Sequence, residues 1–92
     1  MNPKRSKVAI IHDILLLIRS KAGEARPTLI MYKANLSHQM LTEYMNEIIQ
    51  KGFILENTDK KGRRTYTITP KGHDFIKDYQ QIRKFFDSYG LE

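Results

Sequence analysis

The sequence of 92 residues predicts a single, mainly helical domain that also contains one small β-hairpin. Apolar residues recur at three- and four-residue spacing over most of the chain, which is typical of amphipathic helices. A short central region instead alternates polar and apolar residues, as a β-strand does. Only one hydrophobic core is expected, because a chain of this size buries only about 60 to 65 % of its unfolded surface.

The first helix is expected from Lys7 to Ala22. Ser6 can cap its N-terminus through the side-chain oxygen, and Gly23 can end it. Its apolar residues cover a wide arc, so other elements must pack against more than one side. These residues are Val8, Ile10, Ile11, Ile14, Leu15, Leu17 and Ile18.

A second helix is expected from Pro27 to about Ala34. Proline suits the first turn, where its missing N–H would have no intrahelical acceptor, and Thr28 can satisfy the free amides. Asn35 and Leu36 then form a tight connection to the next helix.

A third helix is expected from His38 to Lys51, with Ser37 as its N-cap and Gly52 as its end. One stripe of this helix is apolar and contains Leu41, Tyr44, Met45 and Ile48. Two helices joined by so short a turn indicate a helix-turn-helix.

Two strands follow, at 53–58 and 63–69, and both are rich in β-branched and aromatic residues. The segment DKKG between them supplies turn chemistry, so the pair predicts a β-hairpin. In the second strand the threonines at 65, 67 and 69 predict a polar face, and Tyr66 and Ile68 predict a face that packs on the helices.

The last helix is expected from Pro70 to about Tyr89, with Thr69 as its cap. Its apolar residues are spaced four, three, four and three apart, which predicts a heptad seam formed by Phe75, Tyr79, Ile82, Phe86 and Tyr89. Three helices, two strands and a long C-terminal helix form the α-α-α-β-β-α order of a winged helix-turn-helix domain, here a single domain spanning 1–92.

The net charge of +6 and the pI near 9.7 suggest a polyanionic partner, either nucleic acid or an acidic membrane surface. Residues 1–26 carry six cations against two carboxylates, and residues 59–64 carry four against one. The longest apolar run, 9–18, is too short and too polar to cross a bilayer or to act as a signal sequence. We therefore expect a cytoplasmic protein that is associated with the chromosome and not with a membrane.

No pattern in the sequence indicates catalysis or metal binding. The chain has no cysteine, and its three histidines lie on different predicted helices without ligand spacing. For His12, beside Asp13 in an apolar helix, partial burial with a hydrogen bond is a better account than a metal. Phosphate-binding glycine loops and nucleophile elbows are also missing. We expect a non-enzyme with no cofactor, no metal and no small-molecule ligand.

The segments IIHDILLLI, IMYKANLSHQMLTEYMNEIIQKGFI and YTITPKG resemble the archaeal winged-helix DNA-binding proteins of about ten kilodaltons. The resemblance runs from Val8 to about Phe86, and MYKANLS, LTEYM and TPKG are its most specific parts. It implies binding of double-stranded DNA, with 37–51 as the recognition helix and 59–64 as the tip of the wing. It also implies a homodimer in which the last helix, 70–89, forms an antiparallel coiled coil.

The third helix carries side chains that can form hydrogen bonds with base edges. If its apolar stripe faces the core, its polar residues point outward, and its N-terminal end enters the major groove. The candidate base-reading residues are His38, Gln39, Thr42 and Asn46. Glu43 could accept a hydrogen bond from cytosine, but phosphate repulsion ranks it lower. An exposed helix face is also often polar without touching any partner.

The expected phosphate contacts lie mainly in the hairpin turn and before the first helix. They are Lys4, Arg5, Lys7, Ser37, Lys60, Lys61, Arg63 and Arg64. A solvated hairpin tip is the alternative for the turn, because lysine and arginine also protect edge strands from pairing.

The aromatic residues in the distal half of the last helix have no later element to cover them. We expect Phe75 and Tyr79 to pack on the first helix of the same chain, and a second copy to cover Ile82, Phe86 and Tyr89. Two functions fit these features. The first is a DNA-binding transcription regulator or chromosome-associated protein, and the second is a winged helix that binds proteins without DNA.

Overall fold

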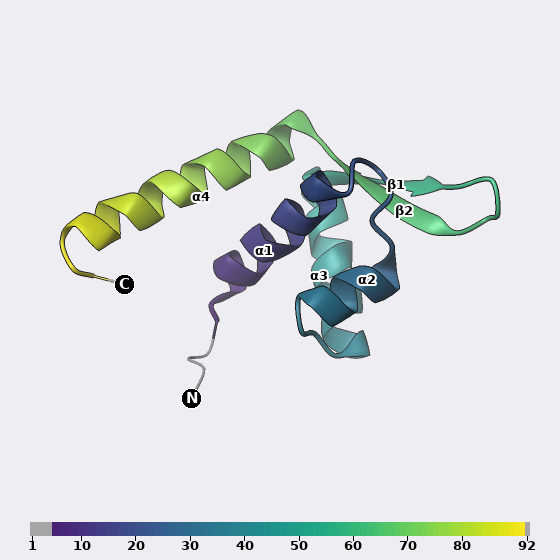
Figure 1. Cartoon of the computed structure of the whole chain (residues 1–92), viewed down its shortest axis with the longest axis horizontal. Helices are drawn as coiled ribbons and strands as arrows, with labels where there is room; N and C mark the ends of the chain where they lie inside the picture. Colours follow the sequence, from purple (N-terminus) through teal and green to yellow (C-terminus); the bar gives the residue numbers. More distant parts are fainter. Residues whose placement is uncertain (1–4, 92) are drawn as a thin grey trace.

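The computed structural model describes residues 5–91, and it confirms the predicted fold class. Figure 1 shows a group of helices, a hairpin that projects from one side of this group, and a long helix that projects from the other side. The elements, in chain order, are α1 (Lys7–Ser20), α2 (Pro27–Lys33), α3 (His38–Gln50), β1 (Ile54–Thr58), β2 (Arg64–Ile68) and α4 (Pro70–Ser88).

Three of the predicted N-caps are confirmed. The side-chain oxygens of Ser6, Ser37 and Thr69 each accept a hydrogen bond from the amide three residues further on, at 3.1 to 3.2 Å. The prediction for α2 is wrong, because Thr28 does not cap it. The capping position, which needs an extended backbone, is occupied by Arg26, and no side-chain hydrogen bond is made there.

Some predicted ends are a few residues too long. α1 ends at Ser20 and not at Ala22, because Ala22 and Gly23 both adopt positive φ values, 51° and 88°, that no right-handed helix can contain. The other helices and both strands end within one residue of the predicted bounds.

The hydrophobic core is centred on α1, which lies in the middle of the fold in Figure 1. The wide apolar arc predicted for α1 is confirmed, except that Val8 at its N-terminal end is 48 % exposed. The largest side chains with less than 2 % exposure come from every helix and from β1: Ile14, Leu15, Ile18, Ile30, Ile48, Ile54 and Ile76.

β1 and β2 pair in antiparallel register, with Ile54 opposite Ile68, Glu56 opposite Tyr66 and Thr58 opposite Arg64. The predicted polar face of β2 is wrong at Thr65, which is only 8 % exposed. The connection between α1 and α2 lies against this strand, because Ala25 pairs with Tyr66 and Gly23 lies near the Thr67 hydroxyl. The edge of β2 that does not pair with β1 is therefore bonded by a segment that is distant in sequence.

The first turns of α4 are fixed to the segment that follows α3. The Thr69 hydroxyl donates to the Gly52 carbonyl at 2.6 Å, and the Thr69 amide donates to the Phe53 carbonyl at 3.0 Å. Gly72 is buried at this contact, and a Cβ atom built on it would lie 2.3 Å from the Phe53 oxygen. This residue must be glycine for α4 to approach so closely.

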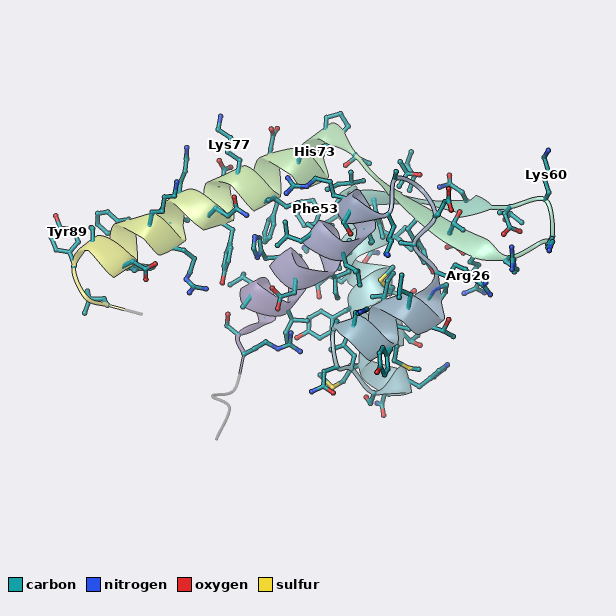
Figure 2. The ribbon with its side chains drawn as sticks, in the orientation of Figure 1. Arg26, Phe53, Lys60, His73, Lys77 and Tyr89 are labelled. Atoms are coloured by element: carbon teal, nitrogen blue, oxygen red, sulfur yellow. The ribbon has the colours of Figure 1, made fainter. Side chains whose placement is uncertain are left out.

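The apolar residues of α4 divide between its two halves. Tyr79 packs against His12 of α1 with ring centroids 4.5 Å apart, as predicted, whereas Phe75 packs against Phe53 at 5.1 Å. Figure 2 shows Phe53 between α1 and α4. The residue of α4 that enters the core most deeply is Ile76, which the predicted aromatic seam leaves out.

Candidate nucleic-acid interface

A surface depression lies between α3 and the hairpin, and we call it the α3–wing depression. Its floor is apolar and includes Leu41, Met45 and Tyr66. Its rim is formed by polar side chains of both elements, with a contribution from the start of α2: Pro27, His38, Thr42, Asn46, Glu56 and Arg64. The fold thus places a helix face and a basic strand residue on the same concave surface.

Three of the four predicted base-reading residues line this depression. His38, Thr42 and Asn46 are one helical turn apart and therefore project from the same side of α3. Gln39 does not line the depression, and its amide donates to the Glu43 carboxylate at 3.2 Å. The four predicted residues are divided between two adjacent strips of one helix.

The hydrogen-bonding groups on this side of α3 differ in their availability. The Thr42 hydroxyl donates to the backbone carbonyl of His38 at 3.1 Å, and the Ser37 hydroxyl oxygen accepts from the Met40 amide at 3.1 Å. Among residues 5–91, the side-chain amide of Asn46 has no hydrogen-bond partner, and Asn46 is exposed. Asn46 therefore has both a donor and an acceptor to offer a ligand.

The hairpin presents charged residues to the depression through strand alternation. Ile54 faces the core, so Glu56, two residues further along β1, projects from the same face. Tyr66 lies opposite Glu56 on β2. Arg64, two residues before Tyr66, lies on the same face and nearer the tip of the hairpin. The Arg64 Nε atom lies 3.2 Å from the Glu56 carboxylate. Burial raises the pKa of the Tyr66 phenol, and the Glu56 charge raises it further, so Tyr66 stays neutral.

The tip of the hairpin is basic, and its loop is held by Asp59. The Asp59 carboxylate accepts from the backbone amides of Lys61 and Arg63, each at 2.9 Å, and from the Arg63 side chain at 2.9 Å. The Arg63 amide, more than any other group, holds the pKa of Asp59 below its usual range. Within the described part of the chain, the exposed ammonium groups of Lys60 and Lys61 have no ion-pair partner. Figure 2 shows Lys60 at the far end of the hairpin.

Two of the three predicted N-terminal cations, Arg5 and Lys7, are paired inside the domain. Arg5 contacts the Asp13 carboxylate at 2.8 Å and donates to the Ala34 carbonyl at the end of α2. Lys7 lies 2.8 Å from Glu47, whose hydrogen bond and charge raise the pKa of Lys7. Lys4 lies outside the described residues.

Two residues of this surface are missed by sequence reasoning. Arg26 is exposed at the start of α2, next to Pro27 on the rim, and Figure 2 shows it near the base of the hairpin. No periodic pattern marks a loop residue of this kind. Glu56 could have been found, because alternation from Ile54 places it on the inner face of β1.

The distal half of α4 exposes apolar side chains. Ile82 is 53 % exposed, Phe86 is 40 % exposed and Tyr89 is 69 % exposed. Phe85, which the predicted seam omits, is 59 % exposed, and its ring lies 5.7 Å from that of Phe86 and 5.3 Å from that of Tyr89. An apolar groove runs between this half of α4 and the start of α1. Across residues 5–91, no helix is both long enough and apolar enough to span a membrane.

Comparisons with known proteins agree with this architecture. The chain is similar to uncharacterized protein MJ0290 of Methanocaldococcus jannaschii, with 33 % identity over 79 residues. That match covers 86 % of this chain and 34 % of the relative, so the chain spans about a third of the relative's length.

Two solved structures share the fold at low sequence identity. Sso10a-2, a DNA-binding protein from Sulfolobus solfataricus, matches with a TM-score of 0.72 and 24 % identity, over 94 % of this chain and 90 % of that one. FabT of Streptococcus pneumoniae, solved in complex with DNA, matches with a TM-score of 0.66 and 20 % identity, over 87 % of this chain and 56 % of that one.

The expected resemblance to small archaeal winged-helix proteins is confirmed by these matches. The profile of one family covers most of the sequence, from residue 4 to residue 86, and its description is winged helix-turn-helix. Its span includes every helix and both strands of the fold, apart from the last residues of α4. The chain belongs to the winged helix-turn-helix family.

Proposed function

We propose that this protein binds double-stranded DNA, with α3 in the major groove and the basic hairpin on the phosphates. The observation that carries the proposal is the α3–wing depression, where Asn46 and Thr42 of α3 share one concave surface with Arg64 of the hairpin. A single duplex can meet all three residues. Two proteins of similar fold support this assignment, since one is described as DNA-binding and the other was solved with DNA.

The two parts of the surface would have different roles. The Asn46 amide can form a bidentate pair with adenine in the major groove, and Thr42 and His38 can contact neighbouring base edges. Lys60, Lys61 and Arg64 would neutralise phosphates and release counterions. Asn46 would therefore contribute to sequence preference, and the hairpin would contribute to affinity.

The acidic residues of α3 are compatible with this role. Glu47 is paired with Lys7 at 2.8 Å, and Glu43 accepts a hydrogen bond from Gln39 at 3.2 Å. Neither residue lines the α3–wing depression. The same pairing means that Lys7 is a weaker candidate for a phosphate contact than Lys60 or Lys61.

We also propose that the protein acts as a homodimer through the distal half of α4. Its support is the exposed apolar strip of Ile82, Phe85, Phe86 and Tyr89, which borders the apolar groove beside α1. A second copy of α4 could cover this strip through a two-fold contact and would place two recognition helices on one duplex. The dimer would act as a non-catalytic transcription regulator or chromosome-associated protein in the cytoplasm.

The DNA assignment is tested by fluorescence anisotropy with a labelled duplex of random sequence at several salt concentrations. Replacing Lys60 and Lys61 by alanine should weaken binding and reduce the slope of log K against log salt by about 0.9 for each phosphate that is no longer neutralised. Replacing Lys77 and Lys84 on the exposed side of α4 removes the same charge, and it should leave the slope unchanged. Absence of binding to any duplex at low salt would favour the protein-binding alternative.

Sequence preference and dimerisation need separate measurements. Asn46→Ala should change which duplexes are recovered by selection from a random pool, with little change in the salt slope. Sedimentation should give a mass near twice 10.8 kDa, and Phe86→Ser should lower that mass. A monomer at tens of micromolar would contradict the dimer and leave the DNA assignment intact.

A further inference from the structure

The ion pair between Glu56 and Arg64 lies inside the proposed DNA-binding surface, and it suggests a role that neither residue has alone. We infer that Glu56 is a positioning residue for Arg64: it holds the guanidinium in the free protein and thereby lowers the affinity for duplex DNA. This inference rests on the proposed DNA-binding function. It concerns the strength of binding and not the choice of site.

The geometry places the pair where it can affect DNA binding. Glu56 and Arg64 project from the same face of the hairpin, across two paired strands, and both line the α3–wing depression with Asn46. The Arg64 Nε atom is 3.2 Å from the Glu56 carboxylate. The Arg64 side chain is 70 % exposed, and the Glu56 side chain is 40 % exposed. The guanidinium can therefore leave the carboxylate when a phosphate is available.

The position of Glu56 is unusual for a surface that meets a polyanion. Its carboxylate would face the duplex, where it repels phosphates and competes with them for Arg64. The other carboxylate of the hairpin, Asp59, has a structural use, because it accepts three hydrogen bonds that shape the loop. Glu56 has no such use, since Arg64 is its only side-chain partner among the described residues.

An exposed ion pair of this kind restrains the Arg64 side chain only weakly. Pairs of this exposure are stabilising by so little that breaking one lowers affinity by at most about fivefold. This cost applies to every duplex whose phosphates Arg64 contacts, so the ion pair lowers the affinity for DNA without changing the ratio of affinities between sites.

The test is a double-mutant cycle on a random-sequence duplex, measured by anisotropy at several salt concentrations. The proteins are the wild type, Glu56→Gln, Arg64→Ala and the double variant, with Asp74→Asn on exposed α4 as a control for the loss of one negative charge. Thermal unfolding of each variant confirms that the fold is kept. Glu56→Gln should bind about two- to fivefold more tightly and with a steeper salt slope, by up to about 0.9 per wing.

The decisive comparison is between the double variant and Arg64→Ala. If Glu56 acts by holding Arg64, these two proteins should bind alike, and Asp74→Asn should bind like the wild type. Unchanged or weaker binding of Glu56→Gln would overturn the inference while leaving the DNA-binding proposal in place. An equal gain from Glu56→Gln with and without Arg64 would also overturn it, because Glu56 would then act by general repulsion. Absence of duplex binding by the wild type would overturn both proposals.

Discussion

Replacement of Gly72 by alanine should lower the free energy of unfolding by about 1 to 3 kcal/mol, because overpacking of a tight site costs that much. A Cβ atom at this position would lie 2.3 Å from the Phe53 carbonyl oxygen and 2.7 Å from Cγ1 of Ile68. Real Cβ atoms essentially never lie so close to another heavy atom, so the backbone carbonyl must move.

Two smaller effects of the Gly72 substitution oppose each other. Moving the Phe53 carbonyl would weaken its 3.0 Å hydrogen bond from the Thr69 amide, which is worth about 1 kcal/mol. Alanine would in turn favour the helix by up to about 1 kcal/mol relative to glycine. The steric effect therefore decides the sign of the change.

The assay for Gly72→Ala is thermal unfolding followed by circular dichroism, and the midpoint should fall by roughly 5 to 20 °C. Gly62→Ala is a suitable control, because Gly62 has a φ of 78° but no heavy atom lies within 4 Å of a Cβ added there. The control should lose only the smaller cost of a left-handed alanine, about 1 to 2 kcal/mol. A Gly72→Ala protein as stable as the wild type would refute the close approach of α4 to Phe53.

Three further predictions concern single residues. Ser37→Ala should cost about 1 kcal/mol in urea unfolding, because the Met40 amide loses its acceptor, and a loss of less than a few tenths would contradict this role. Arg5→Ala should also destabilise the domain, since Arg5 joins Asp13 to the end of α2; an unchanged unfolding midpoint, together with a reduced salt slope for DNA binding, would instead make Arg5 a phosphate contact. Burial lowers the pKa of His12 below its ordinary 6.5, so the unfolded chain takes up the proton first and stability should fall as the pH drops below about 6.5. His12→Gln should flatten the pH dependence of the urea midpoint in that window, and an equally steep dependence in the variant would contradict the assignment.

The features that can be predicted from the sequence are those set by short-range rules. Ser6, Ser37 and Thr69 cap helices because of their own chemistry and that of the next three residues. The strands are recognisable from local alternation, and the helix-turn-helix from the short turn between two helices. No knowledge of the tertiary structure is needed for these predictions.

The features that escape prediction depend on segments that are distant in sequence. The sequence presents Lys7 as a free cation, but its partner Glu47 lies forty residues away on α3. Alternation places Thr65 on a polar face, but the fold leaves it only 8 % exposed. The aromatic residues of α4 suggest a heptad seam, but the residue of this helix that enters the core is Ile76. The helix can come this close to Phe53 because Gly72, one turn before Ile76, has no side chain.

The attachment of α4 has a consequence for the proposed dimer. The side chains of Thr69 and Lys71 donate to the carbonyls of Gly52 and Lys51, at 2.6 and 2.7 Å, and these carbonyls follow directly after α3. The start of α4 is therefore fixed to the end of α3 by short hydrogen bonds, with Gly72 against Phe53 as a third contact. In a dimer held by the distal half of α4, this rigid attachment would fix the position and orientation of each α3 relative to the dimer axis. Such a dimer would require half-sites at one spacing, whereas a flexible joint would tolerate several.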